Sequence, residues 1–131
     1  VYGPERETGM TAAPSLACRA AARGKDATIP FSGETDFVYV TDVAAAFAEA
    51  AAAPIEGARV YNITGESTTA EAFALAVERA APGVTITAAG PLLPIAPGMD
   101  GASLRRDFPT VPLTTVADGV ARTIAFYREE K

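Results

Sequence analysis

Hydrophobic and polar positions follow a clear pattern between residues 35 and 53. This stretch opens with a continuous apolar run at residues 37–40, which is typical of a strand covered on both faces. An alanine-rich segment follows, in which Val43, Phe47 and Ala51 recur every four residues and predict the buried stripe of a helix. The pattern therefore predicts a buried strand that leads directly into a helix.

Asp42 lies where this strand gives way to the helix. Its carboxylate can accept a hydrogen bond from a backbone N–H of the new helix, and its negative charge suits the positive end of the helix dipole. A cap explains both the position and the residue type, so we interpret Asp42 as a structural residue rather than a catalyst.

The same alternation of strand-like and helix-like patterns continues on both sides of this stretch. Further strands are expected at residues 27–31, 59–63 and 84–88, and helices at residues 11–23, 68–81, 100–107 and 114–127. Pro30 predicts an edge position or a bulge in the first of these strands, because it has no backbone N–H. Thr68 and Glu71 have the spacing of a capping box. Strands that alternate with helices indicate an α/β fold.

The composition is that of one globular domain. The chain has 131 residues, of which 49% are hydrophobic and 21% charged, so it can bury a core and is not disordered along its length. A net charge of −5 argues against nucleic-acid and anionic-membrane partners. No apolar run reaches the roughly 18–20 residues of a membrane span, and the default expectation is a soluble, cytoplasmic protein.

Cysteine and histidine usage narrows the candidate chemistry. Cys18 is the single cysteine, so an internal disulfide is excluded and a reducing compartment is favoured. The absence of histidine removes the commonest general base and the commonest zinc ligand. A metal site would need carboxylates alone, and we expect none.

Several stretches resemble, in order, the C-terminal half of an extended short-chain dehydrogenase/reductase, the NAD-dependent epimerase/dehydratase family. Residues 1–6, VYGPER, are similar to the family's V-Y-G-P-G-R. Residues 37–44, FVYVTDVA, resemble its f-v-y-V-x-D-v-A, and residues 61–65, YNITG, resemble its Y-N-i-g-G. The expected helix start at residue 68 and the closing helix near residue 116 also fall in the family's order, so the resemblance covers nearly the whole chain.

The resemblance implies that the catalytic half lies elsewhere. In the family, a Rossmann domain with a Gly-rich loop binds NAD or NADP, and a Tyr-x-x-x-Lys pair moves the hydroxyl proton. These features precede the family's V-Y-G-P, and this sequence has no G-x-G-x-x-G. Residues 1–131 are therefore expected to be a single C-terminal substrate-binding portion of a longer protein, with no catalytic residue and no cofactor of its own. Tyr127 and Lys131 match Tyr-x-x-x-Lys by chance, at the end of a helix.

Six residues are candidates for contacts with a substrate: Tyr2, Arg6, Met10, Thr11, Phe31 and Thr35. Tyr2 either stacks near the substrate or packs as a strand-end aromatic residue. Arg6 either binds an anionic group through its guanidinium or pairs with a carboxylate such as Glu5 or Glu7. Met10 and Thr11 either line a cleft or serve as core filler and helix N-cap, and Phe31 borders the substrate in the family while suiting a core equally well.

Thr35 marks a departure from the family that bears on the substrate. Members that act on nucleotide sugars carry an arginine here, in an R-D-F motif, and that arginine contacts the diphosphate. Residues 33–37 read GETDF, so the cation is missing and Glu34 and Asp36 leave two negative charges nearby. This favours a small sugar, sugar acid or other hydroxy compound as substrate. A second departure is Glu5, which replaces a glycine of the family motif.

Three functions stay open on the sequence. The first is an NAD(P)-dependent oxidoreductase or epimerase for a small hydroxy compound, of which this chain is the substrate-binding portion. The second is a nucleotide-sugar epimerase or dehydratase that holds its diphosphate elsewhere. The third is a non-enzymatic binding module of the same fold. The expected partners are a small-molecule substrate and the missing Rossmann portion, with homodimerisation possible for the full-length protein.

Overall fold

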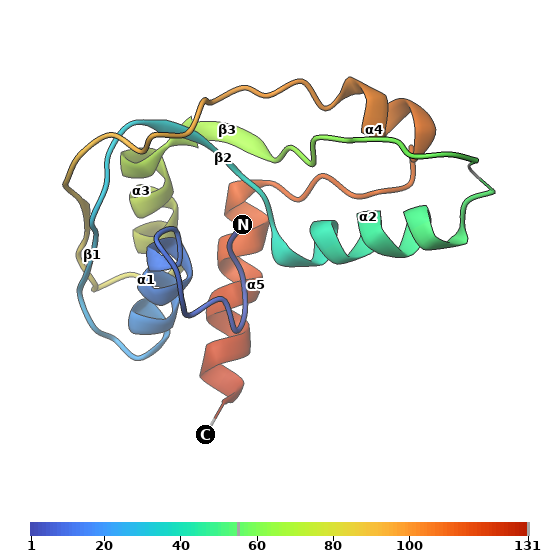
Figure 1. The fold of residues 1–131 in the computed structure, drawn as a ribbon. Helices are drawn as coiled ribbons and strands as arrows, with labels where there is room; N and C mark the ends of the chain where they lie inside the picture. The colour runs from blue at the N-terminus through green and yellow to red at the C-terminus, as the bar shows by residue number, and fades with distance from the viewer. Residues whose placement is uncertain (55, 131) are drawn as a thin grey trace.

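Three helices form the body of the molecule in the computed structural model, which describes residues 1–54 and 56–130. They are α1 (Ala13–Ala22), α3 (Ala70–Ala80) and α5 (Val116–Glu129), and each packs against the other two. Figure 1 shows them side by side, with α2 (Val40–Ala52) and α4 (Ala102–Asp107) extending away from this bundle. Each of these helices lies at a position where the sequence pattern predicts helix.

Two short two-stranded sheets cover this helical body (Figure 1). β1 (Ala27–Ile29) pairs in parallel with β4 (Ile86–Ala88), and β2 (Glu34–Phe37) pairs antiparallel with β3 (Glu66–Thr69). β1 ends immediately before Pro30, which cannot donate to a strand ladder. The architecture is mixed α/β, as the alternating pattern predicts.

The main core is built around aromatic rings. Phe37 and Phe73 stack with their ring centroids 4.6 Å apart, and the ring of Tyr2 meets Phe73 edge-on at 5.0 Å. Phe73 and Val77 of α3 are fully buried. Val120 of α5 belongs to the same cluster. Aromatic contacts of this kind contribute about 0.5–1.5 kcal/mol each beyond the area they bury.

Gly119 of α5 makes room for Tyr2. A Cβ atom at this glycine would overlap the Tyr2 hydroxyl oxygen, so no other residue fits here without a shift of the tyrosine ring. The Tyr2 hydroxyl donates to the Thr115 carbonyl oxygen at 3.4 Å. The segment at Tyr2 is therefore locked against α5.

The helix starts differ from prediction in register. α1 begins after Ala12, whose position has no side-chain cap, so the expectation that Thr11 is the N-cap was wrong. Thr69 rather than Thr68 caps α3, accepting from the Ala72 N–H at 3.1 Å. This shift of one residue removes the predicted capping box with Glu71. The expected cap of α5 is confirmed, because the Thr115 hydroxyl accepts from the Asp118 N–H.

Asp42 is structural, as predicted, but it is not the cap of α2. The strand ends at Phe37 and the helix begins at Val40, so Asp42 already lies within the first turn. Its buried carboxylate accepts from both the backbone N–H and the hydroxyl of Thr114, each at 2.7 Å. Asp42 therefore ties α2 to the segment that precedes α5.

α2 buries much less than its pattern predicts. Ala46 packs with Leu104 and Phe108 in a second, small cluster, whereas the Phe47 side chain is 69% exposed. The stripe predicted through Phe47 is wrong, because this helix has a partner on one narrow face only. Asp42 and Ala46 are the residues of α2 that are buried on that face.

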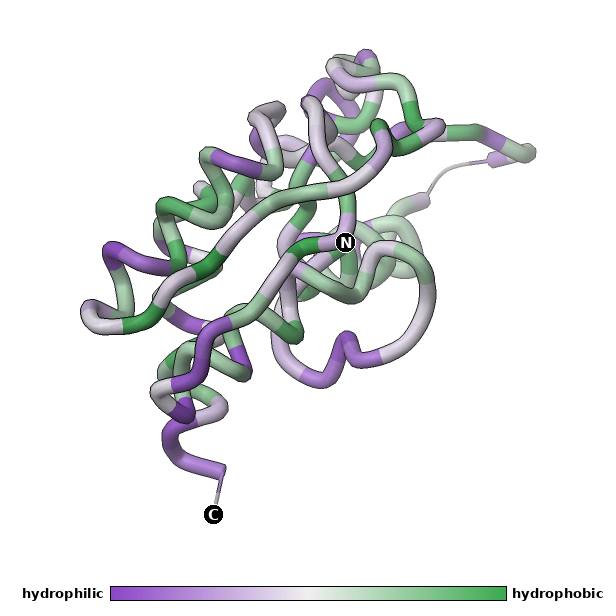
Figure 2. The backbone as a smooth tube through the Cα atoms, turned by 90° about the vertical axis from the view of Figure 1, so that its left-hand side faces the viewer, coloured by the Kyte–Doolittle hydropathy of each residue, from purple (hydrophilic) through white to green (hydrophobic). Residues whose placement is uncertain are grey.

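The strand predicted at residues 59–63 is absent from the described residues. This segment is unpaired, and Val60 is 92% exposed. The Tyr61 hydroxyl holds it to α4 through a 2.8 Å hydrogen bond to the Asp107 carboxylate. Figure 1 shows the green segment that leads to β3 running above α2, away from the helical body, and Figure 2 shows hydrophobic and hydrophilic residues intermixed along much of the chain.

Neither a membrane-spanning helix nor a metal cluster occurs within residues 1–54 and 56–130. No helix there combines the length and apolarity that crossing a bilayer requires. No group of three or more acidic or cysteine side chains in that part of the chain is placed to hold a metal ion.

Candidate functional site

A cavity of about 180 Å³ opens between the N-terminal segment, the β2 strand and the loop at residues 90–99. Fourteen residues from several separate segments line it. Val1 and Tyr2 come from the N-terminal segment, and Thr35 comes from β2. The loop supplies Met99 among its lining residues. The cavity thus lies where residues distant in the sequence converge, as binding sites in folded domains often do.

Four of the six predicted substrate residues belong to the wall of this cavity. They are Tyr2, Thr11, Phe31 and Thr35. Arg6 and Met10 do not line it. The structure therefore brings together the predicted aromatic and threonine residues and leaves the predicted cation and thioether outside.

Tyr2 contributes its ring to the wall rather than a free hydroxyl. The residue is almost fully buried, and its hydroxyl is engaged by the Thr115 carbonyl. Burial raises the pKa of the Tyr2 phenol well above its ordinary value. The packing interpretation of Tyr2 describes this geometry, and the phenol stays protonated at neutral pH.

Two threonine hydroxyls supply hydrogen-bonding groups to the wall. Thr35 lies on β2 opposite Thr68 of β3 and is buried, while Thr11 is half-buried ahead of α1. Neither hydroxyl is hydrogen-bonded to another residue in the part of the chain that the structure describes. A hydroxyl of this kind can donate to, or accept from, an uncharged polar group of a ligand.

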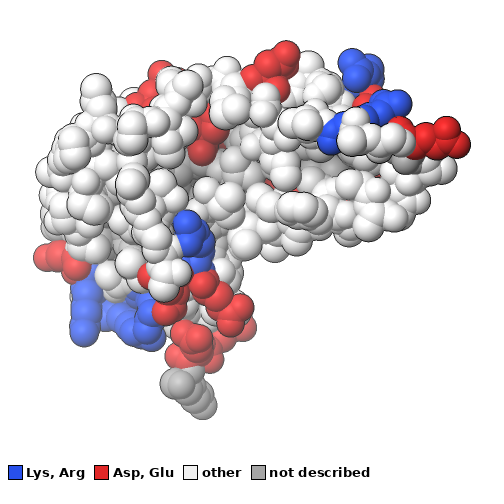
Figure 3. All heavy atoms as spheres, viewed as in Figure 1, with Lys and Arg blue, Asp and Glu red and all other residues white. Residues whose placement is uncertain are grey.

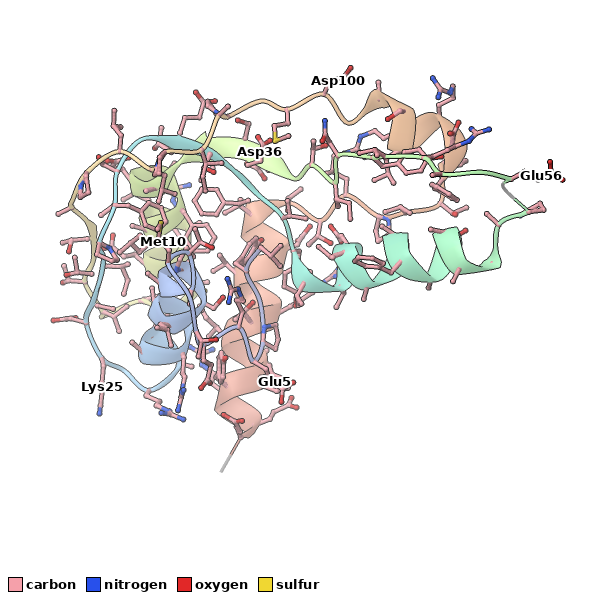
Figure 4. All side chains as sticks on the ribbon, viewed as in Figure 1. Glu5, Met10, Lys25, Asp36, Glu56 and Asp100 are labelled. Carbon is pink, nitrogen blue, oxygen red and sulfur yellow. The ribbon has the colours of Figure 1, made fainter. Side chains whose placement is uncertain are left out.

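Asp36 fastens the loop that closes one side of the cavity. One of its carboxylate oxygens accepts from the Gly98 N–H at 3.0 Å and the other from the Met99 N–H at 3.1 Å. At the other end of the loop, Ser32 donates through its hydroxyl to the Gly90 carbonyl at 2.8 Å. Figure 4 shows Asp36 between β2 and the loop that leads to Asp100. Sequence reasoning counted Asp36 only as a nearby negative charge.

Arg6 and Met10 belong to the surface loop before α1. The Arg6 guanidinium donates to the Thr8 carbonyl and lies against Gly9. Of the carboxylates suggested as partners of Arg6, Glu7 pairs instead with Arg19 at 2.6 Å. Met10 is largely exposed, so it is not core filler.

Positively charged side chains are scarce at this site. Among the described residues that line the cavity, Asp36 has the only charged side chain. In Figure 3, Lys and Arg lie on the lower part and at the upper right of the molecule, and the charged groups visible along its upper middle are acidic. The arrangement suits a neutral group much better than a phosphate or carboxylate, which needs a cation or several donors.

The three helices of the body lack the loop that binds the pyrophosphate of a dinucleotide. α1, α3 and α5 begin after Ala12, Thr69 and Thr115, and no glycine-rich strand-to-helix loop precedes any of them. Such a loop is what brings a pyrophosphate onto a helix N-terminus. A cavity of about 180 Å³ is also below the roughly 300–1,000 Å³ of ordinary cofactor and ligand sites.

Of the known proteins compared with this chain, the matches are all to solved structures. No family model matches the sequence, and no curated protein matches it. The structure of UDP-glucuronic acid 4-epimerase from Bacillus cereus, in complex with UDP-glucuronic acid and NAD, matches at 18% identity with a TM-score of 0.78 over 99% of this chain. UDP-glucose 4-epimerase from Thermus thermophilus, in complex with NAD, matches at 24% identity with a TM-score of 0.75 over 97% of this chain.

A third similar structure is named for an amino-acid substrate rather than a nucleotide sugar. It is a partial consensus L-threonine 3-dehydrogenase, at 21% identity and a TM-score of 0.68 over 88% of this chain. The chain spans 43% of each of the two epimerase chains and 42% of this dehydrogenase.

These likenesses establish the class of fold. The chain shares its α/β fold with part of the two UDP-sugar epimerases and of a dTDP-glucose 4,6-dehydratase, all three solved in complex with NAD. The resemblance expected from the sequence motifs is thereby confirmed as a likeness of fold, and the match covers less than half of each of these enzyme chains.

Proposed function

We propose that this chain is the substrate-binding portion of an NAD(P)-dependent oxidoreductase or epimerase that acts on a small sugar, sugar acid or other hydroxy compound. The catalytic tyrosine and lysine, and the residues that hold the cofactor, belong to the remainder of the protein. The cofactor supplies hydride transfer when it is bound there. The residues of this chain bind and orient the substrate and exclude water from it.

The cavity wall at Thr35 is the observation that carries this proposal. Thr35 stands where the resembling family members that bind nucleotide sugars have an arginine, and in this structure its side chain lines the cavity. A threonine cannot make the charge-assisted, bidentate contact that a diphosphate receives from arginine. A hydroxyl instead suits a hydroxyl or carbonyl group of a small substrate.

The exposed apolar surface of α2 and of residues 57–65 supports the involvement of a further portion of the protein. Phe47 and Val60 are both largely exposed, and the sequence pattern predicts Phe47 to be buried. The similar solved chains are more than twice as long as the part matched here. We infer that the dinucleotide-binding portion covers this surface in the complete protein.

Calorimetric titration tests this assignment. We expect no binding of NAD, NADP or UDP-glucose by this chain below millimolar concentration. Sub-millimolar binding of NAD or NADP would contradict the placement of the cofactor site outside residues 1–131. Sub-millimolar binding of UDP-glucose would support the second candidate function, a nucleotide-sugar epimerase or dehydratase, which the likeness to two UDP-sugar epimerases favours.

A second test uses the sequence that precedes Val1 in the coding region. A glycine-rich strand–turn–helix followed by Tyr-x-x-x-Lys is expected there. Their absence from a continuous reading frame would contradict an enzymatic role and leave a binding module of the same fold.

A further inference from the structure

We propose that the part of the substrate that enters the cavity is uncharged and largely apolar, a compact ring or branched carbon skeleton with one hydroxyl or carbonyl group. This inference rests on the proposed function and narrows its substrate class. Among sugars, sugar acids and other hydroxy compounds, it selects hydroxy compounds with an apolar body.

The walls of the cavity are the first reason. Ten of its fourteen lining residues have side chains without a nitrogen or oxygen atom. Phe31 and Phe37 come from the segment that includes β2, and Leu93, Ile95 and Met99 come from the loop at residues 90–99. An apolar group gains free energy on transfer to such a surface, whereas a polyol must give up hydrogen bonds to water that the walls cannot replace.

The use of Asp36 is the second reason. Its two carboxylate oxygens each accept a backbone N–H from the loop, so the charge is committed to holding the loop in place. An incoming carboxylate or phosphate would lie near this negative charge, with no cationic side chain among the described lining residues to offset it. Burial of an anion without a partner is strongly unfavourable. The side-chain groups left to a ligand are the Thr11 and Thr35 hydroxyls.

Size is the third reason. An engineered apolar cavity of about 150 Å³ in another protein accommodates benzene, so a cavity of about 180 Å³ takes a six-membered ring with one substituent. A nucleotide sugar has several times that volume and cannot lie within these walls.

Ligand-observed and protein-observed NMR titrations of this chain test the inference with three probes: cyclohexanol, D-glucuronate and UDP-glucose. Cyclohexanol is expected to bind with a millimolar Kd, to perturb the Phe31 and Met99 signals, and to show nuclear Overhauser effects from its ring protons to both residues. Glucuronate is expected to bind at least tenfold more weakly at the same signals. Thr35→Val, which keeps the side-chain shape and removes the hydroxyl, is expected to raise the Kd of cyclohexanol about fivefold, the loss of one hydrogen bond.

Thr28→Val is the matched control. Thr28 lies on β1, away from the cavity, where its hydroxyl meets that of Thr87 at 2.9 Å. The Kd of cyclohexanol is expected to change less than twofold in this variant.

The inference is overturned if cyclohexanol does not bind, if glucuronate binds equally well or better, or if Thr35→Val leaves the Kd of cyclohexanol unchanged. In these cases the proposed function stands, because a small hydroxy compound of another kind still satisfies it. Sub-millimolar binding of UDP-glucose that perturbs the Phe31 signal overturns both this inference and the proposed function. If Thr35→Val does not fold, the test is the nuclear Overhauser effects from cyclohexanol to Phe31 and Met99 in the unaltered chain. Their absence overturns the inference.

Discussion

At the scale of single residues, Glu5 holds a backbone conformation that suits glycine. Its φ is 62°, in the left-handed region, and the family motif that this segment resembles has glycine at the same place. The Glu5 N–H donates to the Tyr127 hydroxyl at 2.9 Å, which keeps the residue in this conformation. A departure visible in the sequence alone thus corresponds to a local cost of about 1–2 kcal/mol in the structure.

Replacing this residue tests that cost. Glu5→Gly is expected to raise the free energy of unfolding by about 0.5–1 kcal/mol, because relief of the left-handed strain exceeds the extra chain entropy of glycine. Thermal unfolding followed by circular dichroism measures the change. Glu56→Gly, at an exposed position outside helices and strands, is the control and is expected to be neutral or slightly destabilising.

Cys18 gives a second prediction at this scale, for the dependence of stability on pH. Burial raises the pKa of its thiol to about 12. The folded state thus holds the proton more tightly than the unfolded state, whose thiol titrates near pH 8.5. The protonated thiol therefore contributes to the free energy of unfolding in full below about pH 8.5. This contribution is lost as pH rises toward 12, at up to about 1.4 kcal/mol per pH unit.

Denaturant unfolding between pH 8 and 10 measures this effect against Cys18→Ala. The variant is expected to show a shallower decline over the same range, since tyrosines titrate mainly above it. Parallel declines in the two proteins would mean that the thiol is not responsible.

At the scale of secondary-structure elements, two phenylalanines with similar patterns have opposite environments. Phe73 on α3 is fully buried, whereas Phe47 on α2 is largely exposed. Phe73→Ala is therefore expected to lower the free energy of unfolding by about 3–5 kcal/mol. Phe47→Ala is expected to change it by less than about 0.5 kcal/mol in this chain. Chemical denaturation of both variants measures these changes. A loss of several kcal/mol in the free energy of unfolding of Phe47→Ala would mean that α2 packs in the main core.

The elements that the sequence predicts well are those with a strong one-sided pattern. α3 and α5 bury the residues expected of them, because their polar faces leave only one way to pack. β3 was missed because its residues ESTT are mostly exposed and carry no hydrophobic alternation. Its pairing with β2 depends on a contact across about thirty residues that no local pattern records.

α2 illustrates the opposite error. Its residues are apolar on nearly every side, so the period of four gave a stripe without a polar face to contrast with it. Alanine forms helices readily and carries little information about which side is buried. The direction of burial was therefore not encoded locally.

At the scale of the whole molecule, the candidate site depends on contacts between distant segments. Aromatic and hydroxyl residues at the cavity could be suggested from motifs, and residues such as Tyr2 and Thr35 do come together there. The role of Asp36 could not be predicted from motifs, because this residue joins β2 to a loop more than sixty residues later in the sequence. Arg6 was suggested from its charge, but its local loop directs it to the Thr8 carbonyl instead.

Removal of the Asp36 carboxylate should release the loop as a unit. Asp36→Ala is expected to increase the hydrogen-exchange rates of the Gly98 and Met99 amides at least tenfold, with little change in the α3 amides. Exchange followed by NMR measures the effect. Asp26→Ala is the control, since Asp26 accepts from the Thr85 N–H at 2.7 Å on a different part of the molecule. Unchanged protection of Gly98 and Met99 would mean that the Asp36 carboxylate is not what holds this part of the loop.

The packing of Tyr2 on Gly119 also governs the order in which this part of the protein can assemble. The hydrogen bond from Tyr2 to Thr115 spans 113 residues, so Tyr2 finds its place only after α5 has been synthesised. At synthesis rates of about 5–20 residues per second, this delay is on the order of ten seconds. During this delay the aromatic residues near the N-terminus lack their contacts with α5. Contacts between residues so distant in sequence also slow folding itself. The ring of Tyr2 therefore stays without its packing partner Gly119 until α5 has been made.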